Sequence, residues 1–242
     1  MIRVTPLRAC CALPLLAAAL VGACTPPVST PAPSPYSLDS LYDAAIQDAA
    51  VYRPQNVLKL NPARPDSLGN VRVVTFTSWP GFANGTDTIT ITRDTWVTMV
   101  PEVRDSCRRF GSELKLRLNQ LLGLPATSGD TLMVEMTVPA RGVFRPVADP
   151  TITTQYPCAD TSETNCGEQF PRDVEPGHVH WMAVQLLDHW QVPGGYPWTR
   201  LGYTYNWHPG SPRYGASEYV VRSGTVASAK QVYPVRLYCA AL

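Results

Sequence analysis

Proline is the feature that most restricts how this chain can fold. The 242 residues include 24 prolines, about twice the usual share, and proline interrupts both helices and central strands. This composition disfavours a bundle of long helices and favours strands joined by turns and irregular loops. Hydrophobic residues make up 45% of the chain, which is enough for a buried core and too much for a disordered protein.

Residues 1–24 have the form of a secretory signal. Two arginines precede an uncharged apolar run at residues 9–23, which is too short to span a bilayer as a helix. Small residues then lead to a cysteine. This ending, Val21-Gly22-Ala23-Cys24, resembles the lipobox of bacterial lipoproteins.

The lipobox resemblance implies that residues 1–23 are removed and that Cys24 is acylated, so a lipid bilayer is the expected partner of the N-terminus. Thr25 follows this cysteine where an aspartate could stand, which resembles outer-membrane sorting in enterobacteria. Residues 24–37 contain five prolines and predict an extended tether. We expect residues 38–242 to form one extracytoplasmic domain in the cell envelope.

Charge and motifs argue against two classes of partner. The 20 Lys and Arg residues nearly balance the 19 Asp and Glu residues, so no excess of positive charge predicts binding to nucleic acid. Neither of the glycine-rich phosphate-binding patterns, GxGxxG or GxxxxGK[ST], occurs. We expect neither a nucleic acid nor a nucleotide as a partner.

Four cysteines lie beyond Cys24, at 107, 158, 166 and 239. An even number of cysteines in an exported chain predicts two disulfides, with three pairings possible. A bridge between Cys158 and Cys166 would close a short polar loop, and Cys107 would then pair with Cys239. No two of them have the CxxC spacing typical of a zinc site.

Periodicity predicts a mixture of helices and strands. Apolar residues three or four apart indicate helices at about 38–50 and 101–122. Alternation indicates strands at 71–77, 88–92, 96–99, 132–138, 199–207, 217–222 and 231–239, with a turn at Asn84-Gly85. Residues 178–190 fit a helix or a strand that turns into one. We therefore expect an α+β fold with a mainly antiparallel sheet, one long amphipathic helix at 101–122 and disulfide stabilisation.

The C-terminal third is rich in aromatic residues, with nine between residues 181 and 219. Rings with polar tips suit a glycan or a protein partner, although rings two apart on a strand usually face the core. The candidate contact residues are Trp198, Arg200, Tyr203, Tyr205, Asn206, Trp207, His208 and Arg213. The leading hypothesis is non-catalytic binding of an extracytoplasmic ligand through this segment.

Histidines support an alternative, an envelope hydrolase. On a strand, His178 and His180 would point to one side and could begin a zinc site, with His208, Glu218, Asp188 or His189 as a further ligand. On a helix they would lie about 200° apart and could not share an ion. No cofactor other than this zinc is expected. A third hypothesis is a structural subunit of an envelope assembly.

Overall fold

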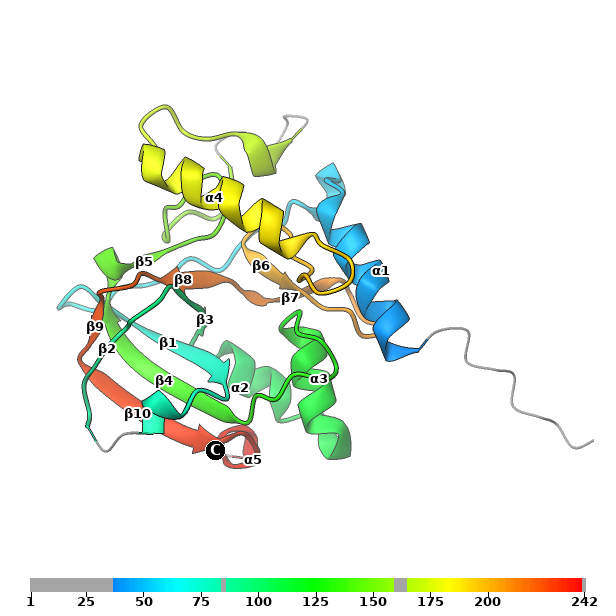
Figure 1. The fold of residues 1–242 in the computed structure, drawn as a ribbon. Helices are drawn as coiled ribbons and strands as arrows, with labels where there is room; N and C mark the ends of the chain where they lie inside the picture. Colours follow the sequence, from blue (N-terminus) through cyan, green and yellow to red (C-terminus); the bar gives the residue numbers. More distant parts are fainter. Residues whose placement is uncertain (1–36, 84–85, 159–164, 241–242) are drawn as a thin grey trace, which may run out of the picture. The chain divides into compact units, whose positions relative to one another are not determined.

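The computed structural model describes residues 37–83, 86–158 and 165–240 (Figure 1). The predicted signal, the lipidation site Cys24 and all of the tether except Ser37 lie outside the described residues, as does the turn at Asn84-Gly85.

Helix α1 spans Leu38–Ala50, which confirms the first predicted helix. The hydroxyl of Ser37 accepts a hydrogen bond of 3.1 Å from the backbone N–H of Ser40, so one of the free N–H groups of the first turn is satisfied. Asp39 places a negative charge in the same turn, where the helix dipole favours it. The buried face of α1 consists of Tyr42, Ala45, Ile46 and Ala49.

A six-stranded antiparallel sheet forms the centre of the fold, in the order β10-β4-β1-β3-β8-β5. Its strands are β1 (Asn70–Thr77), β3 (Thr95–Met99), β4 (Leu132–Pro139), β5 (Val143–Phe144), β8 (Tyr219–Val221) and β10 (Ala229–Pro234). Two short antiparallel pairs accompany it, β2 (Ile89–Thr90) with β9 (Val226–Ala227) and β6 (Tyr203–Tyr205) with β7 (Tyr214–Ser217). The predicted α+β class is thereby confirmed.

Both faces of the sheet are buried. Successive side chains of a strand point to opposite faces, and those of β1 lie in two different hydrophobic clusters. Val73 packs with Val134 and Met136 on one face. Val74 packs on the other face, with residues from three helices that cover it. These helices are α2 (Glu102–Cys107), α3 (Leu114–Leu121) and α5 (Val235–Ala240).

The long helix predicted at 101–122 is divided. Helix α2 ends at Cys107, a 3₁₀ turn follows at Gly111–Glu113, and α3 begins at Leu114. Gly111 has a φ of +61°, a left-handed conformation that no α-helix accommodates and that glycine adopts at little cost. The apolar spacing continues across this break because both short helices turn apolar residues toward the same core cluster.

Two further predicted strands are confirmed only in part. Residues 231–239 were predicted as a strand, but β10 ends at Pro234 and helix α5 follows, because the proline has no N–H for the ladder. In the predicted strand 199–207, only Tyr203–Tyr205 forms a strand, β6. Arg200 and Gly202, which precede it, have positive φ angles that a strand does not accommodate. Residues 178–190, which fitted either element, lie in helix α4 (Pro176–His189).

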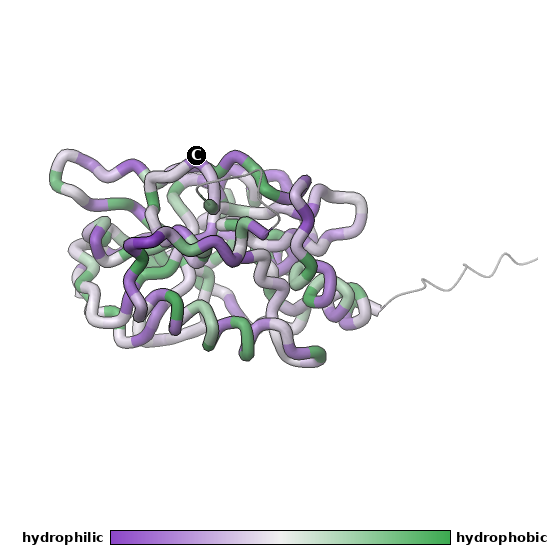
Figure 2. The backbone as a smooth tube through the Cα atoms, turned by 90° about the horizontal axis from the view of Figure 1, so that it is seen from above, coloured by the Kyte–Doolittle hydropathy of each residue, from purple (hydrophilic) through white to green (hydrophobic). Residues whose placement is uncertain are grey.

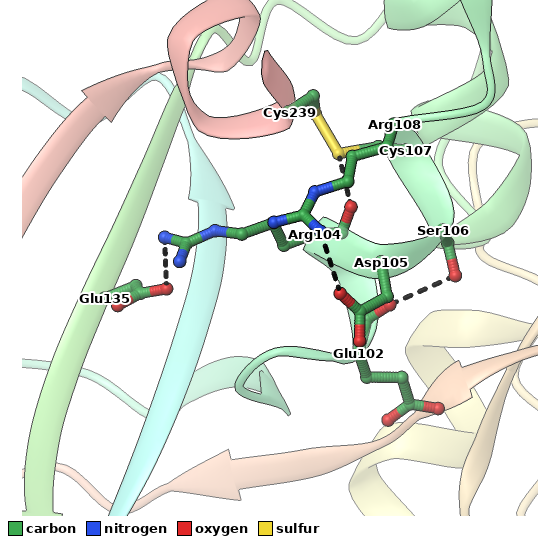
Figure 3. The surroundings of a disulfide bond; sticks show 8 residues. All are labelled: Glu102, Arg104, Asp105, Ser106, Cys107, Arg108, Glu135 and Cys239. Atoms are coloured by element: carbon green, nitrogen blue, oxygen red, sulfur yellow. Dashed lines mark hydrogen bonds and ion pairs between the residues drawn. A yellow bond between two sulfur atoms is a disulfide. The ribbon is translucent and has the colours of Figure 1, made fainter. Parts of the chain in front are cut away.

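Both predicted disulfides are present, Cys107–Cys239 and Cys158–Cys166. The first joins α2 to α5, two helices that cover the same face of the sheet (Figure 3). Beside it, the guanidinium of Arg104 lies 2.8 Å from the buried carboxylate of Glu135. The disulfides indicate an oxidising, extracytoplasmic compartment.

Hydrophobic and hydrophilic residues alternate over short stretches of the described chain (Figure 2). Among residues 37–83, 86–158 and 165–240, none of the helices has the length and apolar character required to cross a bilayer.

Candidate ligand-binding pocket

The candidate site lies where the central sheet divides. Strands β1 and β3 pair only at Val73–Met99 and Val74–Thr98. Beyond these two pairs each strand keeps only its partner on the other edge. Residues 75–77 of β1 still pair with β4, and residues 95–97 of β3 pair with β8. A continued ladder would have joined these two segments to each other. Instead they diverge, and both line one cavity of about 480 Å³, which we call the fork pocket.

The remaining walls of the fork pocket come from distant parts of the chain. They include residues 122–124 after α3, His189 at the end of α4, residues 196–198, Thr204 and Tyr205 of β6, and Glu218 between β7 and β8. A cavity of this size matches the range of small-molecule sites, about 300–1,000 Å³.

Three rings form an aromatic wall of the fork pocket. Trp96 is partly exposed, and its ring centroid lies 5.3 Å from that of His189 and 6.1 Å from that of Trp198. His189 and Trp198 lie 5.3 Å apart. Because all three residues line the cavity, a ligand inside it would contact ring faces and edges.

Glu218 is the buried acid of the fork pocket. Its residue is 8% exposed, and its Oε2 has no hydrogen-bond partner among the described residues. Burial raises the pKa of its carboxyl well above the ordinary value, and the nearby Trp198 indole lowers this pKa in part without reaching hydrogen-bond geometry. The carboxyl is therefore a neutral acid over a pH range in which an exposed glutamate is charged.

Two other buried polar atoms in the fork pocket lack a partner. They are the indole Nε1 of Trp198 and the hydroxyl of Thr98, on residues that are 2% and 6% exposed. Buried polar groups without a partner are uncommon in folded proteins, because each one loses its hydrogen bonds to water. All three residues line the fork pocket, so its walls contain polar groups whose hydrogen-bonding capacity is not fully used within the described residues.

His189 adds an acceptor to this wall. Its Nδ1 lies 2.9 Å from the carbonyl oxygen of Gln185, so Nδ1 carries the proton and Nε2 keeps a lone pair. Burial lowers the pKa of this imidazole, which favours the neutral form.

Four of the residues predicted from sequence line the fork pocket, namely Trp198, Tyr205, Glu218 and His189. The phenol of Tyr205 points elsewhere and donates to the Asp48 carboxylate at 2.6 Å. The other predicted contact residues, Arg200, Tyr203, Asn206, Trp207, His208 and Arg213, do not line it. For Tyr203, Tyr205 and Trp207 the alternative interpretation applies, since all three rings are buried in the core.

The predicted polar contacts outside the fork pocket have partners within the protein, although the buried Nε of Arg200 has none among the described residues. Arg200 is buried and forms an ion pair with Glu168 at 3.1 Å. Arg213 pairs with Asp48 at 3.0 Å. The side chain of Asn206 accepts from the backbone N–H of His208.

The predicted histidine site is not assembled. His178 and His180 lie two residues apart on helix α4 and thus on different sides of it. The Nε2 of His178 contacts the Val147 carbonyl oxygen at 2.7 Å, and His208 contacts Ser211. None of these three histidines lines the fork pocket, and among the described residues no group of three His, Cys, Asp or Glu side chains is placed to hold a metal ion.

Sequence reasoning gave no role to Trp96 or Thr98. Both belong to the strand predicted at 96–99, which the structure confirms as part of β3. Alternation identifies a strand but not its partners, so nothing in this segment predicts that β1 and β3 diverge beside these two residues.

Comparison with known proteins finds no match among protein-family models, curated proteins or solved structures. The geometry and chemistry of the fork pocket are therefore the main indications of function.

We expect the stability contribution of Glu218 to fall as pH rises. Above its ordinary pKa of 4.5 the unfolded chain releases this proton while the folded protein retains it, so protons favour the folded state. Between that pH and the folded-state pKa, the difference in unfolding free energy between wild type and Glu218→Gln should fall by about 1.4 kcal/mol per pH unit. Urea unfolding of both proteins from about pH 5 to about pH 7 tests this. A difference that stays constant with pH would contradict it.

Proposed function

We propose that this protein is a lipid-anchored binding protein of the cell envelope, held at the outer membrane by Cys24. In this proposal the domain is non-catalytic. It holds a small extracytoplasmic ligand, or one sugar unit of a glycan, in the fork pocket. The lipobox-like sequence supports the address, and the two disulfides support an exported domain.

The observation that carries the binding role is the coincidence of a cavity with unpartnered buried polar groups. A cavity of about 480 Å³ has an aromatic wall, and three of its lining residues, Glu218, Trp198 and Thr98, each have a buried polar atom without a partner among the described residues. Apolar walls with a few convergent polar groups are typical of binding sites.

Replacing Trp96 by leucine tests this role. Trp96 contributes the partly exposed ring of the aromatic wall, so its loss should weaken binding of neutral probes at least about tenfold, a typical effect for an aromatic contact. Ligand-observed NMR titrations with glucose, N-acetylglucosamine and 2-phenylethanol would measure it. His208→Ala is the control, because His208 lies in the aromatic-rich segment and outside the fork pocket. Equal weakening by both variants, or no binding by wild type, would argue against the proposal.

A second candidate function is that of a subunit in an envelope assembly. Helix α4 buries only His178 and Met182 and leaves apolar side chains exposed, among them Leu187 at 72%. Exposed apolar residues grouped on one helix are typical of contact surfaces between proteins.

A further inference from the structure

The lining of the fork pocket is rich in acceptors and poor in cations. Its acceptors include the carboxyl groups of Glu218 and Asp94, the Nε2 lone pair of His189 and the faces of the aromatic rings. Among the described lining residues, Arg93 is the one permanent cation, and it is exposed. A ligand that carries negative charge would therefore find no counter-charge inside.

Glu218 has no cationic partner among the described residues. The ion pairs found in the described part of the chain all involve other carboxylates. The phenol of Tyr203, which lies close enough to interact with its charge, donates instead to the Asn56 carbonyl oxygen at 2.8 Å. A buried carboxyl without a partner is costly to charge, and the charge becomes favourable when a cation enters beside it.

The aromatic wall has the geometry that stabilises a cation. Trp96 and Trp198 meet at 83°, edge to face, and the His189 ring lies within 5.3 Å of both. Indole faces attract ammonium groups within about 6 Å of the ring centroid, and the attraction grows when water is excluded. Carboxyl and aromatic rings together therefore favour one class of ligand over neutral alcohols.

We infer that the fork pocket binds an organic ammonium group, held between the carboxylate of Glu218 and the rings of Trp96 and Trp198. This inference rests on the proposed function and names its ligand class. The ammonium can belong to a free amine or to an amino sugar unit of a glycan. The same carboxylate would serve both.

Binding of an ammonium group beside the Glu218 carboxyl changes the number of protons bound to the protein. The neutral Glu218 carboxyl gives up its proton, which leaves to solvent when the ligand arrives as an ammonium ion. The product is a carboxylate–ammonium pair with no net charge. Binding to the wild type should therefore release about one proton per ligand, which calorimetry measures from the dependence of the binding heat on the buffer.

Two matched pairs of probes test the inference by isothermal titration calorimetry. They are 2-phenylethylamine against 2-phenylethanol, and glucosamine against glucose. Wild type should bind at least one amine about tenfold or more tightly than its alcohol, and Glu218→Gln should remove this preference. A preference within the first pair alone identifies a free amine, and one within the second identifies an amino sugar. Glu102→Gln is the control, because Glu102 is a partly buried glutamate, bonded to the Ser217 N–H and outside the fork pocket.

Equal affinity of amine and alcohol, with both weakened by Trp96→Leu, would overturn the inference and leave the proposed function standing. Failure of all four probes to bind would overturn both. If Glu218→Gln does not fold, the proton count of the wild type decides: release of about one proton supports the inference, and release of none overturns it.

Discussion

We expect the double variant Cys107→Ala, Cys239→Ala to lose about 5 kcal/mol of unfolding free energy, about twice the loss from removing Cys158–Cys166. The two bridges close loops of very different length, with sequence separations of 132 and 8 residues. In the chain-entropy model, the longer loop restricts the unfolded chain more, so its removal costs more. Domains typically have an unfolding free energy of about 5–15 kcal/mol. Removal of Cys107–Cys239 should therefore remove a large part of the stability of this domain.

Position in the fold adds to this difference. Cys107 and Cys239 are both buried in the cluster of Val74 and Leu118, so the bridge also fixes α5 against the sheet face. Urea unfolding of wild type and of each double variant, followed by far-UV circular dichroism, gives the two losses. Equal losses would show that loop length does not set the contribution of these bridges. A larger loss from the short bridge would show that the loop around it is the more stabilising region.

Local chemistry made much of the fold predictable. Ser37 and the apolar face behind it gave the bounds of α1, and alternation at 132–138 gave β4. The division at Gly111 was not predicted, because periodicity reports which face is buried and both short helices bury the same one. The helix that carries Cys239 was missed for a related reason, since a six-residue segment is too short for its period to be distinguished from a strand.

The candidate site was predictable only in part. Glu218 and Trp198 were singled out because acids and aromatic rings are typical of binding sites. The cavity that joins them to Trp96 depends on where a ladder between β1 and β3 stops, which is a contact between strands about 20 residues apart in the chain. Composition likewise could not separate rings that line a cavity from rings that fill the core, because both need apolar area and a partner for the polar tip.

Trp207→Ala separates these two roles, and we expect it to destabilise the domain by about 3–5 kcal/mol, as for other large-to-small changes of a buried tryptophan. The ring is 5% exposed and lies 5.6 Å from that of Tyr42, edge to face, against helix α1. Its Nε1 donates to the Leu124 carbonyl oxygen at 2.9 Å. The truncation would remove one of the contacts that hold α1 to the domain and leave that carbonyl without its partner.

Trp207→Phe and Tyr214→Ala make the matched comparisons. The phenylalanine keeps a ring against Tyr42 and loses the hydrogen bond, so it should be clearly less damaging than alanine. Tyr214 is an exposed aromatic of the same segment, and its truncation should change the unfolding free energy by less than about 1 kcal/mol. If Trp207→Ala instead kept the stability of wild type and lost probe binding, Trp207 would belong to a binding surface and the fork pocket would lose its claim to be the site. The expected result, an unstable domain whose remaining folded fraction still binds, places Trp207 in the core and leaves binding to the walls of the fork pocket.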